Sequence, residues 1–123
     1  MLAKSWGEIW EDIKEVARRL RHTGIRTLCK RNLNDILEVK DDYVVVRSHK
    51  PIRPETGLKS RVLKEDDFRY VWNVLVRKGL IMGVKDVPKV RGRRSAILAI
   101  MAQLPYVEGR CEKGRVVLKL KDP

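Results

Sequence analysis

The chain has 123 residues, with 28 Lys or Arg against 16 Asp or Glu, and its formal net charge is +12 at neutral pH. With 43% hydrophobic residues it can build a core, so the composition excludes a wholly disordered chain and favours one domain with a basic surface over residues 1–123. No apolar run approaches the roughly 18–20 residues of a membrane span, and the first ten residues lack the order of a signal peptide. We therefore expect a cytoplasmic protein with no membrane partner.

The first expected element is a helix between Ser5 and Gly24. Ser5 and Glu8 have the spacing of a capping box, in which the hydroxyl and the carboxylate bind free N–H groups of the first turn. Apolar residues then recur every three or four positions, as they do on the buried face of a helix. Trp6 and Trp10 belong to this stripe, which we expect to meet the core or a second copy of the chain.

The segment after this helix predicts short strands. Apolar runs cover 25–29, 36–39 and 43–48, and a lysine with two aspartates separates the last two runs. This pattern indicates a hairpin. A loop that contains two prolines follows over 49–60, and a brief strand is expected over 61–63.

A second helix is expected over 66–78, with Asp66 or Asp67 as its cap and Gly79 at its end. Its buried face should consist of apolar side chains three and four positions apart, namely Phe68, Val71, Trp72 and Leu75. Because successive residues turn by about 100°, the opposite face should carry polar groups and one ring, namely Arg69, Tyr70, Asn73 and Arg77.

A third helix is expected over 96–103, with Ser95 as its cap. This helix is apolar on all sides, so it belongs in a core or an interface. Two strands over 106–111 and 115–120 then form a hairpin. The order of elements predicts a mixed α+β fold with an N-terminal helix, a small antiparallel β-sheet, two further helices and a C-terminal β-hairpin.

Three windows, 47–61, 85–94 and 110–121, each hold five basic residues and one acidic residue, and together they carry the whole net charge of +12. Clustered positive charge suits a polyanion, because each neutralised phosphate releases condensed counterions. The alternative is the solvated surface of a thermophile protein, on which both signs alternate. The nucleic-acid-binding residues that we predict lie in the first two windows and the second helix: Arg47, Lys50, Arg53, Arg61, Arg69, Tyr70, Arg77, Lys89, Arg91, Arg93 and Arg94.

The sequence offers little that could catalyse a reaction. His22 and His49 have no nucleophile or metal ligand at a recognisable spacing. Glu38 and Lys40 have the acid-x-Lys spacing of metal-dependent nucleases, but no suitably placed upstream acid accompanies them. A glycine-rich phosphate loop is also absent from the sequence. We therefore expect no enzyme activity, no cofactor and no metal.

Sequence-independent binding of a single strand requires a basic track and flat side chains on which bases stack. Tyr43, Tyr70 and Tyr106 have basic neighbours and are the stacking candidates, whereas the other aromatic residues lie on apolar helix faces. We expect single-stranded DNA as the partner, with RNA as an alternative. A winged-helix protein on duplex DNA is a further alternative, but the apolar third helix offers few polar groups to base edges.

The stretch 66–79, followed by 93–97 and 104–107, resembles the ThermoDBP-related single-stranded DNA-binding proteins of hyperthermophilic archaea. The resemblance implies a small α+β domain with an apolar cleft edged by basic residues, no catalysis, and oligomers that enclose a single strand. We expect a homo-oligomer, a dimer or a tetramer. The third helix and the Trp6/Trp10 stripe are the contact surfaces that we nominate, because no leucine zipper follows the last strand.

Cys29 and Cys111 are far apart in sequence and lack the spacing of a zinc site or a redox motif. We predict that both are small, buried, free thiols. A disulfide is the alternative, because intracellular disulfides occur in hyperthermophiles, whose high charge and few amide side chains this chain shares.

Overall fold

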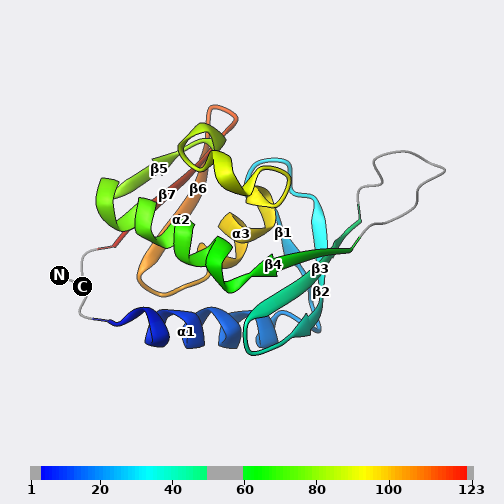
Figure 1. Ribbon diagram of the computed structural model, residues 1–123. Coiled ribbons are helices and arrows are strands. Elements are labelled where there is room, and N and C mark those ends of the chain that lie inside the picture. Colours follow the sequence, from blue (N-terminus) through cyan, green and yellow to red (C-terminus); the bar gives the residue numbers. More distant parts are fainter. Residues whose placement is uncertain (1–3, 50–59, 122–123) are drawn as a thin grey trace.

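The computed structural model describes residues 4–49 and 60–121. The elements follow in the order α1 (Trp6–Arg19), β1 (Ile25–Arg26), β2 (Leu33–Val39), β3 (Tyr43–Ser48), β4 (Ser60–Lys64), α2 (Glu65–Lys78), β5 (Leu80–Met82), the 3-10 turns η1 (Val84–Asp86) and η2 (Pro88–Val90), α3 (Arg94–Met101), β6 (Val107–Glu112) and β7 (Arg115–Leu120). Figure 1 shows the predicted mixed α+β fold. None of the helices in the described ranges is long and apolar enough to cross a membrane.

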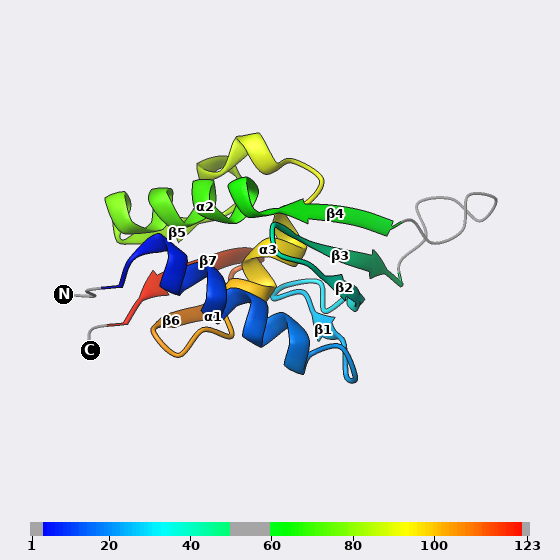
Figure 2. The same cartoon turned by 60° about the horizontal axis from the view of Figure 1, so that its bottom comes forward.

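Two antiparallel sheets flank a central helix. The first sheet has the strand order β1-β2-β3-β4 and the second has the order β5-β7-β6. The central helix, α3, contacts β1 of the first sheet and β6 of the second. In Figure 1, α2 passes in front of α3 and α1 lies below it, and Figure 2 shows α3 between the two sheets.

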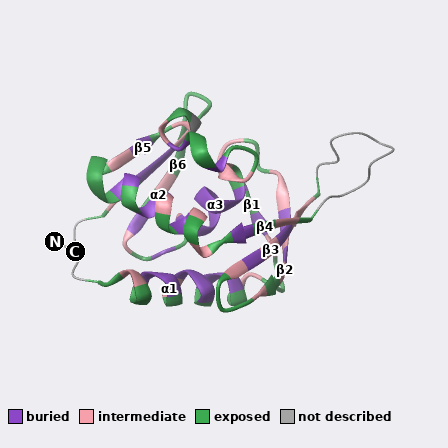
Figure 3. Ribbon diagram, in the orientation of Figure 1, coloured by how far each residue is buried: buried purple, intermediate pink, exposed green. Residues whose placement is uncertain are grey.

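The interior of the molecule contains α3 and Trp10, which belong to the two surfaces that we nominated for self-association. Every residue of α3 from Ala96 to Met101 is buried (Figure 3). Trp10 is 4% exposed and packs on Phe68 of α2, while the half-buried Trp6 stacks on Trp10. Helix α3 and Trp10 are therefore packed within the single chain, whereas Trp6 lies half-buried at the border of the core.

Helix α1 begins as predicted, but α2 begins earlier than predicted. The capping box of α1 is confirmed, because Ser5 Oγ accepts the Glu8 N–H at 3.3 Å and Glu8 Oε1 accepts the Ser5 N–H at 3.2 Å. Strand β4 continues directly into α2, so Lys64 occupies the cap position that we assigned to Asp66 or Asp67. Asp67 instead accepts the Lys64 N–H at 3.2 Å.

Two further differences lie on either side of the segment 84–93. Gly79 ends α2 with φ of 74°, as predicted, but the three residues Leu80–Met82 then form β5, which pairs with β7 and was not expected. Helix α3 begins at Arg94, so Ser95 already lies inside the helix and is not its cap. The cause is that Arg93 enters the helix with nearly helical backbone angles, φ −118° and ψ −5°.

The prediction of two free thiols is wrong. Cys29 and Cys111 form a disulfide with a Cα–Cα distance of 5.1 Å. Neither residue is fully buried: Cys29 is half-buried in the turn after β1, and Cys111 is exposed on β6. The bond therefore links a turn of the first sheet to a strand of the second.

The buried face of α2 is wider than predicted. Val74 is 3% exposed and joins Phe68, Val71, Trp72 and Leu75 in the core. Tyr70 is the neighbour of Val74 on the helix surface, one turn earlier. It is half-buried at the border of the core, so its predicted position on the face opposite the core is wrong.

Candidate nucleic-acid interface

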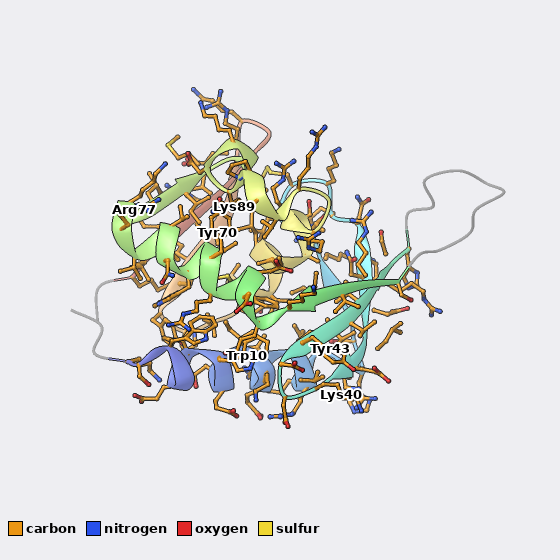
Figure 4. All side chains as sticks on the ribbon, in the orientation of Figure 1. Trp10, Lys40, Tyr43, Tyr70, Arg77 and Lys89 are labelled. Atoms are coloured by element: carbon orange, nitrogen blue, oxygen red, sulfur yellow. A yellow bond between two sulfur atoms is a disulfide. The ribbon has the colours of Figure 1, made fainter. Side chains whose placement is uncertain are left out.

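The segment between β5 and α3 brings basic side chains to the N-terminal half of α2. Lys89 Nζ lies 5.5 Å from the centre of the Tyr70 ring, and Figure 4 shows these two side chains next to each other. Arg93 Nε lies 3.2 Å from Asp67 Oδ2. Arg61, on β4, donates a hydrogen bond to the Gly92 carbonyl oxygen. We call the surface formed by the cationic side chains of Arg61, Lys89, Arg91 and Arg93 the connection surface, and Tyr70 lies at its edge, under Lys89.

The sequence of this segment explains why its cations face outward. Val87 and Val90, three positions apart, are 0% and 1% exposed and hold the segment on the core. Lys89 and Arg91 lie on either side of Val90 and are exposed. Gly92 has φ of 86°, a conformation that favours glycine, and it turns the chain toward α3. The two valines and the glycine thus fix where Lys89 and Arg91 emerge.

Positive charge on the connection surface is only partly neutralised. Arg93 is paired with Asp67, whose side chain is 17% exposed. Among the described residues, no carboxylate lies within 4 Å of the cationic groups of Arg61, Lys89 or Arg91. The guanidinium side chains of Arg61, Arg91 and Arg93, together with Gly92, line a shallow hollow of about 380 Å³. This hollow is open to solvent, and guanidinium groups are donors of the kind that phosphate oxygens accept from.

Several predicted residues lie elsewhere. Arg47 is opposite Ser60 in the register of β3 and β4, so it points to the face of the sheet opposite Arg61. There Asp35 Oδ2 binds both His49 Nε2, at 2.7 Å, and Arg47 Nη2, at 3.3 Å. The hydrogen bond with His49, followed by that with Arg47, keeps the pKa of Asp35 below its usual value. Arg47 is therefore part of a separate, paired cluster.

The remaining predicted residues lie at the edges of the connection surface or outside the described ranges. Arg69 lies over the Trp6 ring, 6.0 Å from its centre, on the side of α2 that faces α1. Arg77 is near the C-terminal end of α2, away from Tyr70 (Figure 4). Arg94 is the first residue of α3 and follows Arg93 directly. Lys50 and Arg53 lie outside the described residues.

The third basic window has a different character. Arg110 lies 3.6 Å from Glu108 and 3.1 Å from Glu112 on the same strand. In the register of β6 and β7, Lys119 is opposite Glu108 and Arg115 is opposite Glu112. Charges of both signs alternate on this sheet, as on a solvated thermophile surface. This window therefore provides a charged surface that is suitable as a control for the connection surface.

Sequence reasoning missed two features of the interface. Asp67 was interpreted only as a cap, although it also pairs with Arg93. Val87 and Val90 were not recognised as anchors, although an i, i+3 apolar pair beside Pro88 is typical of a single buried turn. Among the described residues, no group of three or more His, Cys, Asp or Glu side chains could hold a metal ion.

Comparisons of the chain with protein-family models, with curated proteins and with solved structures find no match. The chemistry of the connection surface is therefore the basis for assigning a function.

Proposed function

We propose that this protein binds single-stranded nucleic acid independently of sequence and without catalysis. The observation that carries the proposal is the convergence of Arg61, Lys89, Arg91 and Arg93 on one surface, with Asp67 as their one paired carboxylate among the described residues. Arginine and lysine contacts to phosphates position a strand without reading its bases.

A flexible single strand suits this surface better than a duplex does. A single strand can adapt the spacing of its phosphates to the cations, whereas duplex DNA stays stiff over about 150 base pairs. The winged-helix alternative also loses its reading element, because α3 is buried from Ala96 to Met101 and cannot enter a major groove. Single-stranded DNA is therefore the proposed partner, and RNA is the comparison that the test includes.

The test is a salt-dependent binding titration. Fluorescence anisotropy with a labelled single-stranded oligonucleotide should give a log–log salt slope of about −2, since the three cations that are not paired with a described carboxylate, Arg61, Lys89 and Arg91, each release about 0.7 counterion. The variant Lys89→Ala/Arg91→Ala should bind at least about tenfold more weakly at low salt and lower that slope by about 1.4. Duplex DNA and RNA titrations run in parallel.

A matched variant controls for net charge. Arg115→Ala/Lys119→Ala also removes two exposed cations, but from the sheet where Glu112 and Glu108 are their partners across the strands. Its affinity should stay within about threefold of that of the wild type. Equal losses in the two double variants would show that only net charge matters and that the connection surface is not the binding site.

A further inference from the structure

The positions of the aromatic rings indicate what the connection surface recognises. The described residues contain all seven aromatic residues of the chain. Phe68, Trp10 and Trp72 are 0%, 4% and 7% exposed, so their rings belong to the core. The four remaining rings, those of Trp6, Tyr43, Tyr70 and Tyr106, are half-buried. A base can stack only on one of these four.

Two of these rings lie on the α1 side of the molecule and are held by polar partners. Trp6 stacks on Trp10, donates its Nε1–H to Glu65 at 2.9 Å and lies under Arg69. Tyr106 donates its hydroxyl to Asp12 at 2.8 Å, and Lys4 Nζ lies 5.3 Å from the centre of its ring. Neither ring belongs to the connection surface.

The third ring lies among acidic groups. Tyr43 lines a hollow together with Asp42, Glu65 and Asp66, and Lys64 is the one cation among the residues that line it. Carboxylates that line the same hollow repel the phosphate that accompanies any base. A nucleotide that stacked on Tyr43 would therefore bring its phosphate to an unfavourable site.

The fourth ring, Tyr70, is the one that touches the connection surface, and it is already covered. Its ring packs against the edge of the core, and Lys89 lies over it at 5.5 Å. A base that stacks on this half-buried ring has to compete with Lys89, which already makes a favourable cation–π contact with it. The connection surface thus presents exposed cations and no open ring.

We propose that the connection surface recognises a chain of phosphate groups and makes no stacking contact with bases. The inference rests on the proposed function and specifies its ligand class. The backbone of a nucleic acid, with or without bases, and inorganic polyphosphate share this chemistry. Arg61, Arg91 and Arg93 suit such a ligand, because guanidinium groups bind phosphate oxygens through paired N–H donors and stay charged at any physiological pH.

The experiment compares three ligands with equal numbers of phosphates. A labelled oligothymidylate is bound first, and an abasic oligodeoxynucleotide and inorganic polyphosphate then compete for it. We expect both competitors to displace the label with midpoints within about threefold of that of unlabelled oligothymidylate. The midpoints of all three should shift equally with salt, since counterion release provides the binding free energy in each case.

A variant without the ring sharpens the test. In Tyr70→Leu, oligothymidylate affinity should stay within about twofold of wild type, because an apolar side chain fills the same edge of the core. If the abasic strand binds about tenfold or more weakly than oligothymidylate, and Tyr70→Leu removes that difference, bases stack on Tyr70 and the inference is wrong. If oligothymidylate itself does not bind, the proposed function fails first.

Competition by polyphosphate has its own control. Lys89→Ala/Arg91→Ala should weaken the abasic strand and polyphosphate by the same factor, whereas Arg115→Ala/Lys119→Ala should weaken neither by more than about threefold. Polyphosphate that binds both double variants as tightly as the wild type would occupy a different surface, and that result would overturn the assignment of polyphosphate to this site.

Discussion

Removal of the Cys29–Cys111 disulfide should destabilise the protein about as strongly as a large-to-small substitution in its core. The two cysteines are 82 residues apart in sequence, so the bond closes a loop that covers most of the chain. For a loop of this length the chain-entropy relation predicts a loss of up to about 4.5 kcal/mol in the free energy of unfolding. With an unfolding entropy of about 0.26 kcal/mol/K for a chain of this size, the melting temperature should fall by up to about 17 °C.

The measurement is thermal unfolding followed by circular dichroism. The oxidised wild type, the reduced wild type and the variant Cys29→Ser/Cys111→Ser are compared, and reductant should leave the variant unchanged. Mass spectrometry after alkylation without reductant should find no free thiol in the wild type. If the variant melts within about 2 °C of the oxidised protein, packing alone joins the two sheets and the loop-closure argument is refuted.

Three further predictions concern single positions. Gly109→Ala should lower the free energy of unfolding by about 1–3 kcal/mol, because a Cβ there would clash with Ala102 Cβ. Gly7→Ala, on the exposed side of α1, should instead raise it by about 0.5–1 kcal/mol. If both variants shift the melting temperature in the same direction, this pair of predictions is wrong. The Met82 N–H donates to the Asp86 carboxylate at 2.8 Å, and this hydrogen bond is the main cause of a pKa of Asp86 below its usual value. The stability that the contact provides is therefore present at neutral pH, and it is lost as the pH falls through and below the usual carboxyl range. Urea unfolding across pH should therefore show a weaker acid dependence in Asp86→Asn, and equal dependence would rule the contact out as a source. Asp67→Asn removes the carboxylate that pairs with Arg93, so oligonucleotide binding should strengthen and its salt slope should steepen by about 0.7. In the control variant Asp66→Asn, the lost charge is not paired with Arg93, so the slope should change less. Identical slopes in the two variants would refute the role of the Arg93 pair.

Local patterns predicted the elements of this fold, while its distant contacts were not predictable. The Ser5 capping box and the spacing of apolar residues in α1 are short-range signals, and both appear in the structure. Strand β5 was missed because three residues between two glycines are too few to show a period. The disulfide depends on a 5.1 Å approach between segments that only the complete fold brings together.

For the candidate site, too, local features could be predicted from the sequence, whereas contacts between distant segments could not. The charge of the second window was evident from the sequence, and the structure places Lys89 and Arg93 beside α2 and Arg91 in one hollow with Arg61 of β4. The face of Arg47 could not be predicted, because the sequence does not show which residue of β4 lies opposite it. The position of Tyr70 depended on whether Val74 is buried, since burial of Val74 moves the border of the core from Val71 toward Tyr70 by about 60°, a sixth of a turn.

In the segment beneath the connection surface, the positions that anchor the chain on the core, Val87 and Val90, are distinct from the positions that carry its charge. Gly83 and Gly92, both with positive φ, mark the ends of a stretch that touches the core through Val87 and Val90. Exposed positions between the glycines, such as Lys85 and Lys89, can accept other side chains without opening the core. Substitutions at these exposed positions can therefore change the charge of the proposed binding surface while the two valines keep the segment on the core.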